Sequence, residues 1–399
     1  MMLKIFNIHI SILSMRTFLT IITIIYSQLI LALEGHIEVN GHRFEVIQKI
    51  GSGGEGDVFE VQEIDQLKRR YALKVEKIMV INPNGSINPL QQEEFTLREY
   101  KFDYFKNRVR NFPDKIKSTF KYLPFTFSYL IHLPEEKFRD PSDPNLLIKS
   151  GVSFMRLADD TLYSQIEKIN QTLFSTIEEQ HKAKSDLALL VFNNIIKELS
   201  ILSEKNYSYL DLKPVNIGFD SISNTYSLLD LNSIYSTFQN EDYHRKILAT
   251  PVYAAPEISD SNNYSEISQL YSLAMTLLNV LDSKFENHII YKMFNKNDNS
   301  YDQNFLIRLE KEYLQSFANI DRSKMSQLFS FIKAATIKDP YTRLKKLREL
   351  SFNQDIVFIA DKANIKQSKT SALIESLKSK LTKTRPELNS KIICDGLFK

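Results

Sequence analysis

The stretch Gly51-Ser-Gly-Gly-Glu-Gly-Asp-Val58 concentrates four of the ten glycines in this 399-residue chain. These glycines are Gly51, Gly53, Gly54 and Gly56. Glycines leave backbone N–H groups open to an anion, so a turn of this kind is suited to cover phosphates. The same G-x-G-x-x-G spacing marks dinucleotide sites, but there a helix follows the glycines. Here Val58-Phe-Glu-Val61 follows and is typical of a strand, so the sequence favours a phosphate-covering hairpin.

The composition is that of an ordinary globular chain, with 43% hydrophobic and 25% charged residues. It excludes intrinsic disorder, collagen and a coiled coil as descriptions of the whole chain. A length of 399 residues fits two lobes better than one core. The net charge of +3 is too small to favour nucleic acid as the main partner. The lone cysteine, Cys394, excludes an intrachain disulfide and a multi-cysteine zinc site.

The expected secondary structure changes character along the chain. Strands are expected at residues 43–50, 57–64, 70–78, 123–133 and 145–157. Helices are expected at residues 91–106, 184–205, 266–281, 305–317, 325–336 and 344–350. A strand-rich first part and a helix-rich second part predict an α+β chain with two lobes that join near residues 155–160.

A lysine lies inside the apolar strand Tyr71-Ala-Leu-Lys-Val75. A buried ammonium group needs an anion, and a phosphate of a nucleotide would supply one for Lys74. A carboxylate on the helix expected at 91–106 would hold the amine in place; Glu99 is the best candidate and Glu94 the second. The alternative is a lysine that points to solvent from an edge strand.

Four later motifs follow in an order that resembles the eukaryotic protein kinase family. They are Tyr209-Leu-Asp-Leu-Lys-Pro-Val-Asn216, Leu228-Leu-Asp-Leu-Asn232, Ala249-Thr-Pro-Val-Tyr-Ala-Ala-Pro-Glu257 and Asp339-Pro-Tyr-Thr-Arg343. With the glycine stretch and Lys74, the resemblance covers residues 43–350. It implies a bilobal protein kinase fold of the α+β class, with an N-lobe at 43–155 and a C-lobe at 156–350. It also implies that the arginine of the last motif pairs with the glutamate of the third.

The resemblance implies a protein serine/threonine kinase that transfers the γ-phosphate of ATP to a protein hydroxyl with Mg²⁺. Asp211 would orient the substrate hydroxyl and accept its proton, and Lys213 would stabilise the moving phosphoryl group. Asn216 and Asp230 would hold Mg²⁺ between the phosphates. Thr250, which would bridge the lysine and the catalytic aspartate, resembles the serine/threonine branch of the family.

The resemblance also implies a set of nucleotide-binding residues. Gly51, Gly53, Gly54 and Gly56 would cover the phosphates, and Lys74 would contact them. Met155 aligns with the residue at the back of the adenine pocket, and Leu157 would offer backbone contacts to the base. Val58 and Ala72 would also line the pocket. These two and Leu157 are equally compatible with plain core positions.

Three departures from the family pattern concern bracing and regulation. The His-Arg pair before the catalytic aspartate is Tyr209-Leu210, and the Phe-Gly after the metal aspartate is Leu231-Asn232. Without that arginine, activation gated by phosphorylation is not expected. Gln269 stands where an aspartate normally braces the catalytic loop, so we expect a looser loop.

Two alternatives to a protein kinase remain open from the sequence. The three departures also fit a pseudokinase that acts as a nucleotide-binding or scaffolding module. A kinase-like fold that phosphorylates a small molecule is less favoured, because residues 250–257 resemble a peptide-binding platform.

The N-terminus carries an apolar run at residues 18–33, preceded by the basic residues Lys4 and Arg16. This pattern predicts a signal peptide or signal anchor over residues 1–35, with entry into the secretory pathway or membrane association through 18–33. A buried helix or strand pair at the start of the fold is the alternative, and would leave the chain cytoplasmic.

The C-terminal segment, residues 351–399, is rich in lysine and is expected to be a basic tail. An apolar helical face at residues 372–381 favours a helix docked on the second lobe. A contact with a membrane surface is the less favoured interpretation.

Overall fold

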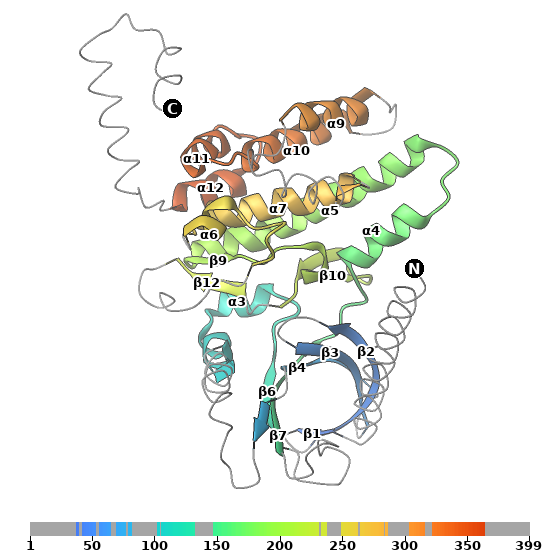
Figure 1. Cartoon of the computed structure of the whole chain (residues 1–399), viewed down its shortest axis with the longest axis vertical. Helices are drawn as coiled ribbons and strands as arrows, with labels where there is room; N and C mark the ends of the chain where they lie inside the picture. Colours follow the sequence, from blue (N-terminus) through green and yellow to red (C-terminus); the bar gives the residue numbers. More distant parts are fainter. Residues whose placement is uncertain are drawn as a thin grey trace, which may run out of the picture.

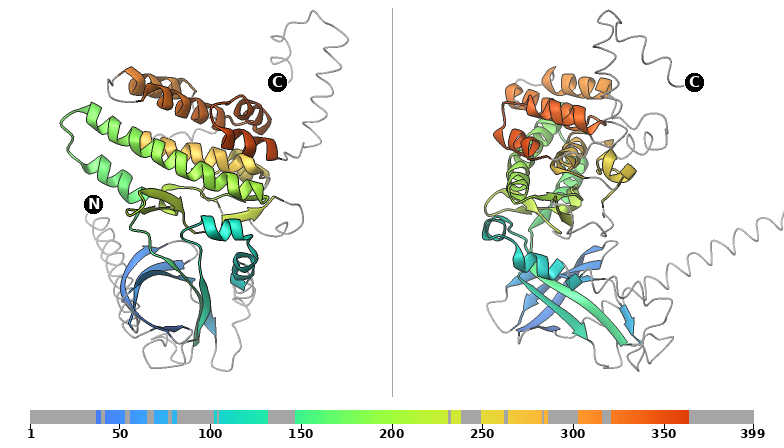
Figure 2. Two further views of the ribbon diagram at one scale, coloured as in Figure 1. Left: turned by 180° about the vertical axis from the view of Figure 1, so that it is seen from behind. Right: turned by 90° about the vertical axis from the view of Figure 1, so that its left-hand side faces the viewer.

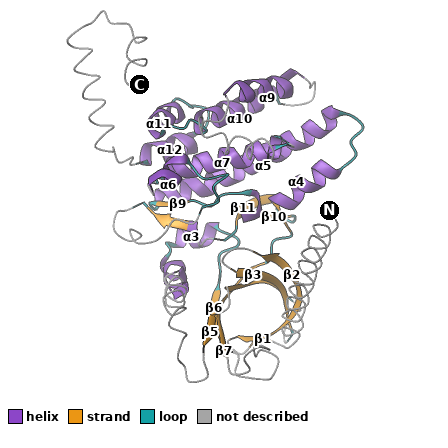
Figure 3. Ribbon diagram, viewed as in Figure 1, coloured by secondary structure: helices purple, strands orange, loops and turns teal. Residues whose placement is uncertain are grey.

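The computed structural model describes residues 37–39, 42–52, 56–64, 69–76, 79–81, 102–103, 105–131, 147–230, 233–237, 249–261, 264–282, 284–285, 303–315 and 321–363. A curved sheet forms the N-terminal lobe and a stack of helices forms the C-terminal lobe (Figure 1). The long strands lie in the N-terminal lobe and the long helices in the C-terminal lobe (Figure 3). The predicted α+β, bilobal architecture is therefore confirmed.

The N-lobe is built on one seven-stranded sheet whose order is β1-β2-β3-β4-β7-β5, with β6 also paired to β7. Its strands are β1 (Ile37–Val39), β2 (His42–Ser52), β3 (Gly56–Glu63), β4 (Arg70–Glu76), β5 (Met79–Ile81), β6 (Thr126–Ile131) and β7 (Leu147–Arg156). All the pairs are antiparallel. Alternate side chains meet on one face of the sheet and form a small core. This core contains Phe44, Phe59, Val61, Leu73, Val152 and Phe154.

The glycine-rich stretch lies where β2 turns into β3, with Gly51 opposite Val58 in the hairpin. At Gly56 a Cβ atom would lie 2.2 Å from the carbonyl oxygen of Val75 on β4. No side chain fits at that distance, so the close approach of β3 to β4 requires glycine here. The hairpin therefore lies against the strand that carries Lys74, which pairs with Val58.

The C-lobe contains eight labelled helices among the described residues, and α3 (Asp114–Thr119) precedes it. They are α4 (Leu162–Gln171), α5 (Ile177–Glu204), α6 (Pro256–Ser261), α7 (Glu266–Leu281), α9 (Gln303–Gln315), α10 (Arg322–Ala335), α11 (Pro340–Arg348) and α12 (Gln354–Lys362). Side-chain caps begin several of them: the hydroxyl of Thr176 accepts from the backbone of Glu179 on α5. Asp339 caps α11, and Pro340 occupies its first turn.

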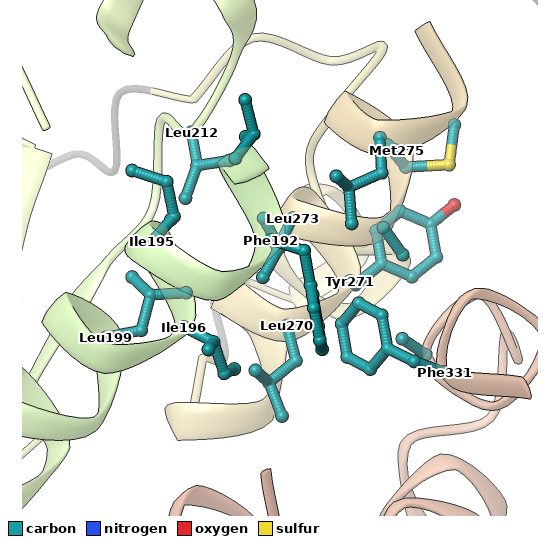
Figure 4. Close-up of a cluster of buried hydrophobic side chains, with 14 of the residues drawn as sticks. Phe192, Ile195, Ile196, Leu199, Leu212, Leu270, Tyr271, Leu273, Met275 and Phe331 are labelled. Carbon is teal, nitrogen blue, oxygen red and sulfur yellow. The ribbon is translucent and has the colours of Figure 1, made fainter. Parts of the chain in front are cut away.

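The centre of the C-lobe is the contact between α5 and α7 (Figure 4). Every residue of α7 is buried, which is the pattern of a helix enclosed on all sides. Leu270 and Leu273 face Phe192 and Ile196 of α5, and Phe331 of α10 closes the cluster (Figure 4). This core is much larger than that of the N-lobe.

Short strands connect the core to the region between the lobes. They are β8 (Asp160–Thr161), β9 (Tyr207–Tyr209), β10 (Ile217–Asp220), β11 (Thr225–Leu228) and β12 (Ile234–Ser236), with the 3-10 turn η2 (Pro214–Asn216) between β9 and β10. One small sheet has the order β11-β10-β8, and β12 pairs with β9. These short strands lie on the side of the C-lobe that faces the N-lobe sheet (Figure 2). Residues 211–216 connect β9 to β10, and Asp230 lies in the connection between β11 and β12.

The packed region continues past residue 350. α12 lies within the segment expected to be a basic tail, and it packs on α5 and α11. Ile356 and Ile359 of α12 are fully buried. The apolar face at residues 372–381 lies outside the described residues.

None of the helices among the described residues is both long enough and apolar enough to cross a membrane. The apolar run at 18–33 lies outside those residues, so its expected role as a signal or anchor stays a prediction.

Candidate active site

Asp211, Lys213 and Thr250 meet in one hydrogen-bonded triangle. The Oδ1 atom of Asp211 accepts from the backbone N–H of Thr250 at 2.8 Å and from its hydroxyl at 2.7 Å. The Lys213 ammonium lies 2.8 Å from Oδ2 of Asp211 and donates to the Thr250 hydroxyl at 2.6 Å. Because Thr250 is 39 residues away along the chain, this triangle fixes the segment at 249–257 against the catalytic loop. The carboxylate is thereby held in one orientation.

Asn216 ends the same loop and is tied to its beginning. Its side-chain N–H₂ donates to the backbone oxygen of Asp211 at 2.9 Å and to Oδ2 at 3.0 Å. The backbone oxygen of Asn216 accepts from the backbone N–H of Leu229 at 2.8 Å. With both amide hydrogens directed at Asp211, the amide oxygen of Asn216 is left to face another ligand.

Lys74 and Asp230 join the two lobes directly. The Lys74 ammonium lies 2.8 Å from Oδ1 of Asp230, and its side chain is only 8% exposed, against 29% for Asp230. Asp230 has a φ of 45°, in the left-handed region, which turns the chain at this point. We expected an anion beside the buried Lys74 ammonium. Within the described residues, that anion is the carboxylate of Asp230, which comes from the opposite lobe. Glu99 and Glu94 both lie outside those residues.

The other residues predicted to bind the nucleotide lie around the same place. Ala72 pairs with Met155 across β4 and β7, and Leu157 directly follows β7. Val58 is the neighbour of Lys74 on β3. A cavity lies beside them, lined by Lys74, Phe105, Tyr122, Pro124, Ser153, Met155 and Asp230. Gly53 and Gly54 lie outside the described residues.

The donor set fits a hard divalent cation. Asn216 offers an amide oxygen and Asp230 a carboxylate, and Mg²⁺ is bound in proteins through oxygen ligands of these kinds. Both residues are fixed from behind, Asn216 by Asp211 and Asp230 by Lys74. A Mg²⁺ ion that also binds phosphates keeps several of its waters, so it needs only one or two oxygen ligands from the protein. Asn216 and Asp230 would supply two.

Gln269 braces the catalytic loop, which corrects our expectation of a looser loop. Its Oε1 accepts from the backbone N–H of Tyr209 at 3.0 Å, and its Nε2 donates to the Ser203 hydroxyl at 2.8 Å. Gln269 is fully buried, so both bonds lie in the core. The glutamine has enough reach to make the contact that a shorter side chain makes in the family pattern. The expectation was wrong because it considered only the type of side chain at this position and not its length.

Tyr209 connects the loop at 211–216 to the segment that ends at Asp230. Its hydroxyl donates to the backbone oxygen of Leu229 at 2.7 Å, one residue before Asp230. Burial, with the charges of Asp230 and Asp211, raises the pKa of Tyr209 well above its ordinary value, so the hydroxyl stays a neutral donor. A tyrosine therefore ties together the two segments that carry Asp211 and Asp230.

The segment at 249–257 is also fixed at its far end. The Arg343 guanidinium donates to both oxygens of Glu257, at 2.6 and 3.0 Å, and its side chain is fully buried. The Ser268 hydroxyl donates to the same carboxylate at 2.8 Å. This pairing is the one that the resemblance implied for the third and fourth motifs.

Two supporting residues were missed by the sequence reasoning. Glu198 of α5 accepts from the backbone N–H of Leu228 at 2.8 Å and from the Ser227 hydroxyl, and burial raises its pKa to about 7. Arg108 donates to the backbone oxygen of Ile234, shortly after Asp230 in the chain. A glutamate on the apolar face of a predicted helix was a signal for the first. No sequence signal pointed to the second, because a backbone acceptor leaves no trace in the sequence.

Known proteins were compared with this chain. Residues 145–353 match the family model of the protein kinase domain. The serine/threonine-protein kinase ULK3 of Xenopus laevis is 33% identical over 86 residues, which cover 22% of this chain and only 18% of that protein. A solved structure, the ROP18 kinase domain in complex with AMP-PNP and sucrose, superposes with a TM-score of 0.50 over 82% of this chain and 84% of that one. Its 14% identity shows a shared fold alone. Because the family model spans more than half of its residues, the chain belongs to the protein kinase domain family.

Proposed function

We propose that this protein is an active serine/threonine protein kinase that uses ATP and Mg²⁺. The observation that carries the proposal is the triangle of Asp211, Lys213 and Thr250 beside the Lys74–Asp230 pair. Phosphoryl transfer needs positioned groups and neutralised charge more than covalent chemistry, and these residues supply both.

The proposed reaction forms a bond between a substrate serine or threonine oxygen and the γ-phosphorus of ATP. The bond from that phosphorus to the β–γ bridging oxygen breaks, and ADP leaves. Asp211 orients the hydroxyl and takes its proton, and Lys213 offsets the charge of the phosphoryl group in transit. Asn216 and Asp230 would hold Mg²⁺, which neutralises the phosphate charge when it is bound.

Phosphotransfer from labelled ATP to a protein substrate by the full chain tests this function. We expect Asp211→Asn to lower the rate by about 10²–10⁴-fold, because it removes the proton acceptor. Lys74→Met should also lower it, since it removes the cation beside Asp230. Circular dichroism of each variant checks that it is folded. An equal signal from the wild-type chain and both folded variants would contradict the proposal.

A pseudokinase is the second candidate, favoured by Tyr209-Leu210 in place of the family's His-Arg pair and by Leu231-Asn232 in place of its Phe-Gly pair. Thermal shift with ATP and Mg²⁺ separates the two candidates. Stabilisation by the nucleotide without phosphotransfer would favour a binding or scaffolding module. Stabilisation together with phosphotransfer that depends on Asp211 would exclude it.

We also propose that residues 18–33 direct the chain to the secretory pathway or a membrane, which rests on sequence alone. A basic flank before the run would then place the lobes across the membrane from the N-terminus. Asn170-Gln-Thr172 is an N-glycosylation sequon, so a loss of mass at Asn170 on glycosidase treatment would support this. A kinase domain degraded only when protease reaches the cytosol would contradict it.

A further inference from the structure

Two segments of the described chain cross between the lobes. The first crossing, residues 120–125, runs from α3, whose Ile116 lies in the C-lobe core, to β6 of the N-lobe sheet. The second, residues 157–159, runs from β7 of that sheet to β8, which pairs with β10 in the C-lobe. Leu157, which is expected to contact the nucleotide base, lies in the second crossing. A movement of one lobe relative to the other therefore has to bend or shift these segments.

Both crossings pack against the same glycine of β10. A Cβ atom on Gly218 would lie 2.8 Å from Cε2 of Tyr122 in the first crossing and 3.0 Å from Cβ of Ala158 in the second. It would also lie 2.9 Å from Cδ2 of Leu229, the residue before Asp230. Contacts this short leave no room for a side chain, so a glycine at this position lets both crossings pack on the strand.

Two residues further along β10, a buried carboxylate binds a cation from beside each crossing. The Oδ2 atom of Asp220 lies 3.3 Å from the Lys121 ammonium and 3.1 Å from the Arg156 guanidinium. Lys121 belongs to the first crossing, and Arg156 ends β7 directly before the second. The side chain of Asp220 is only 6% exposed, against 28% for Lys121 and 55% for Arg156. Because the carboxylate is buried, solvent and salt screen these contacts less than they screen an exposed pair.

The carboxylate of Asp220 is itself held in one orientation. Its Oδ1 atom accepts from the backbone N–H of Ser223 at 2.9 Å and from the Ser223 hydroxyl at 3.0 Å. These bonds, with the ammonium of Lys121, lower the pKa of Asp220 to about 2, so the carboxylate is charged at neutral pH. Lys121 is fixed as well, because its ammonium also donates to the Thr225 hydroxyl at 2.8 Å. The turn between β10 and β11 is therefore a preformed acceptor for the two cations.

We propose that Asp220 is a positioning residue that restrains the opening of the two lobes and, through Arg156, holds Leu157 in place for the nucleotide base. The role at the base rests on the proposed ATP-binding function, whereas the restraint on the lobes does not. Loss of one cation frees one crossing, and loss of the carboxylate charge frees both. The release of nucleotide then becomes faster, while Asp211 and Lys213 keep their arrangement within the C-lobe.

The rate at which fluorescent methylanthraniloyl-ADP dissociates from the full chain tests this role. We expect Asp220→Asn to raise that rate by about fivefold or more, and Arg156→Met to raise it by less, because Lys121 still binds the carboxylate. The double variant should be no faster than Asp220→Asn alone, since Arg156 acts through Asp220. Phosphotransfer in a single turnover at saturating ATP should stay near the wild-type rate, which separates a change in lobe opening from a damaged catalytic loop.

Glu310→Gln is the matched control. Glu310 of α9 pairs with Lys333 of α10 at 2.9 Å, and the two side chains are 17% and 30% exposed. This variant therefore removes a partly buried ion pair of the C-lobe that involves neither crossing. It should keep the wild-type rate of ADP dissociation. Circular dichroism of each variant checks that it is folded.

Hydrogen exchange without nucleotide gives a second readout, which does not depend on ATP binding. The backbone N–H of Asp159 in the second crossing donates to the backbone oxygen of Phe219 at 3.0 Å. It should exchange faster in Asp220→Asn than in the wild-type chain, and at the wild-type rate in Glu310→Gln. Wild-type exchange and wild-type ADP dissociation in folded Asp220→Asn and Arg156→Met proteins would overturn the proposal. A wild-type chain that binds no ADP would instead contradict the proposed function, and the exchange would then decide alone whether Asp220 restrains the lobes.

Discussion

Two buried contacts brace the catalytic region from the C-lobe, and they differ in chemistry. Arg343 and Glu257 form a bidentate ion pair, and both are the residue types expected from the family pattern. Gln269 and Tyr209 form a neutral contact in which both residue types depart from that pattern. Both contacts hold a backbone segment near Asp211 in place. What holds these two segments, the loop after Tyr209 and the segment that ends at Glu257, is therefore the position of a donor and an acceptor, and charge is one of two ways to supply them.

The two contacts should nevertheless respond differently to substitution. Removing one member of a buried ion pair leaves an uncompensated charge in the core, which is costly. Removing one member of a neutral hydrogen bond leaves only an unsatisfied polar group, which costs less. The comparison therefore predicts a ranking of effects.

The largest effect is expected at the charged brace. Arg343→Ala should lower the free energy of unfolding by about 3–5 kcal/mol, because Glu257 keeps its charge and loses both guanidinium donors. The variant also loses the bonds from Arg343 to the backbone oxygens of Ile337 and Lys338. Urea denaturation followed by circular dichroism measures the change.

The control for this variant lies on the same helix. Arg348 of α11 pairs with Asp361 at 2.9 Å, but the two side chains are 45% and 61% exposed. Arg348→Ala should cost less than about 1 kcal/mol, as is usual for exposed pairs. Equal losses of unfolding free energy from the two substitutions would show that burial does not set the strength of the Arg343–Glu257 pair.

A pH-dependent effect of intermediate size is expected at Glu198 of α5, whose side chain bonds to β11. Burial raises its pKa from 4.5 to about 7, against the hydrogen bonds from Ser227 and Leu228 and the charge of Lys121. The folded chain therefore binds this proton more tightly than the unfolded chain, so stability falls as the pH rises from about 4.5 to about 7. Glu198→Gln should remove that fall and raise the unfolding free energy at pH 8 by on the order of 3 kcal/mol, at about 1.36 kcal/mol per pKa unit.

Urea denaturation at pH 5 and at pH 8 measures this difference. Glu178→Gln is the matched control, because Glu178 is an exposed glutamate at the start of the same helix. A Glu198→Gln protein that keeps the wild-type pH profile would show that Glu198 does not cause the fall.

Elements with a strong periodic pattern could be predicted from the sequence almost to the residue. The helix expected at 266–281 is α7, because apolar residues recur at helical spacing from Ile267 to Leu281 and the polar Asp282 follows them. The helix expected at 184–205 begins earlier, at Ile177, because the threonine cap at Thr176 and two acidic residues in the first turn extend it with a polar segment. Periodicity alone does not detect such a start.

The candidate site divides in the same way. Asp211, Lys213, Asn216 and Thr250 could be predicted because short motifs hold them at fixed spacing, and the structure places them in contact. The Lys74–Asp230 pair joins residues 156 positions apart, so no local pattern could reveal it.

The smallest effect is expected at the neutral brace. Gln269→Leu should lower the unfolding free energy by about 1–3 kcal/mol, because the buried N–H of Tyr209 and hydroxyl of Ser203 both lose their partner. It should also lower kcat, since the loop that carries Asp211 loses its support.

Gln269→Asp, which restores the residue of the family pattern, gives the sharper comparison. At a position that is fully buried, a carboxylate places a charge in the core without a paired cation, so this variant should be less stable than the wild type. Urea denaturation and steady-state kinetics of both variants measure these effects. A Gln269→Asp protein that is more stable and faster than the wild type would show that charge, and not reach alone, is what a brace at this position needs.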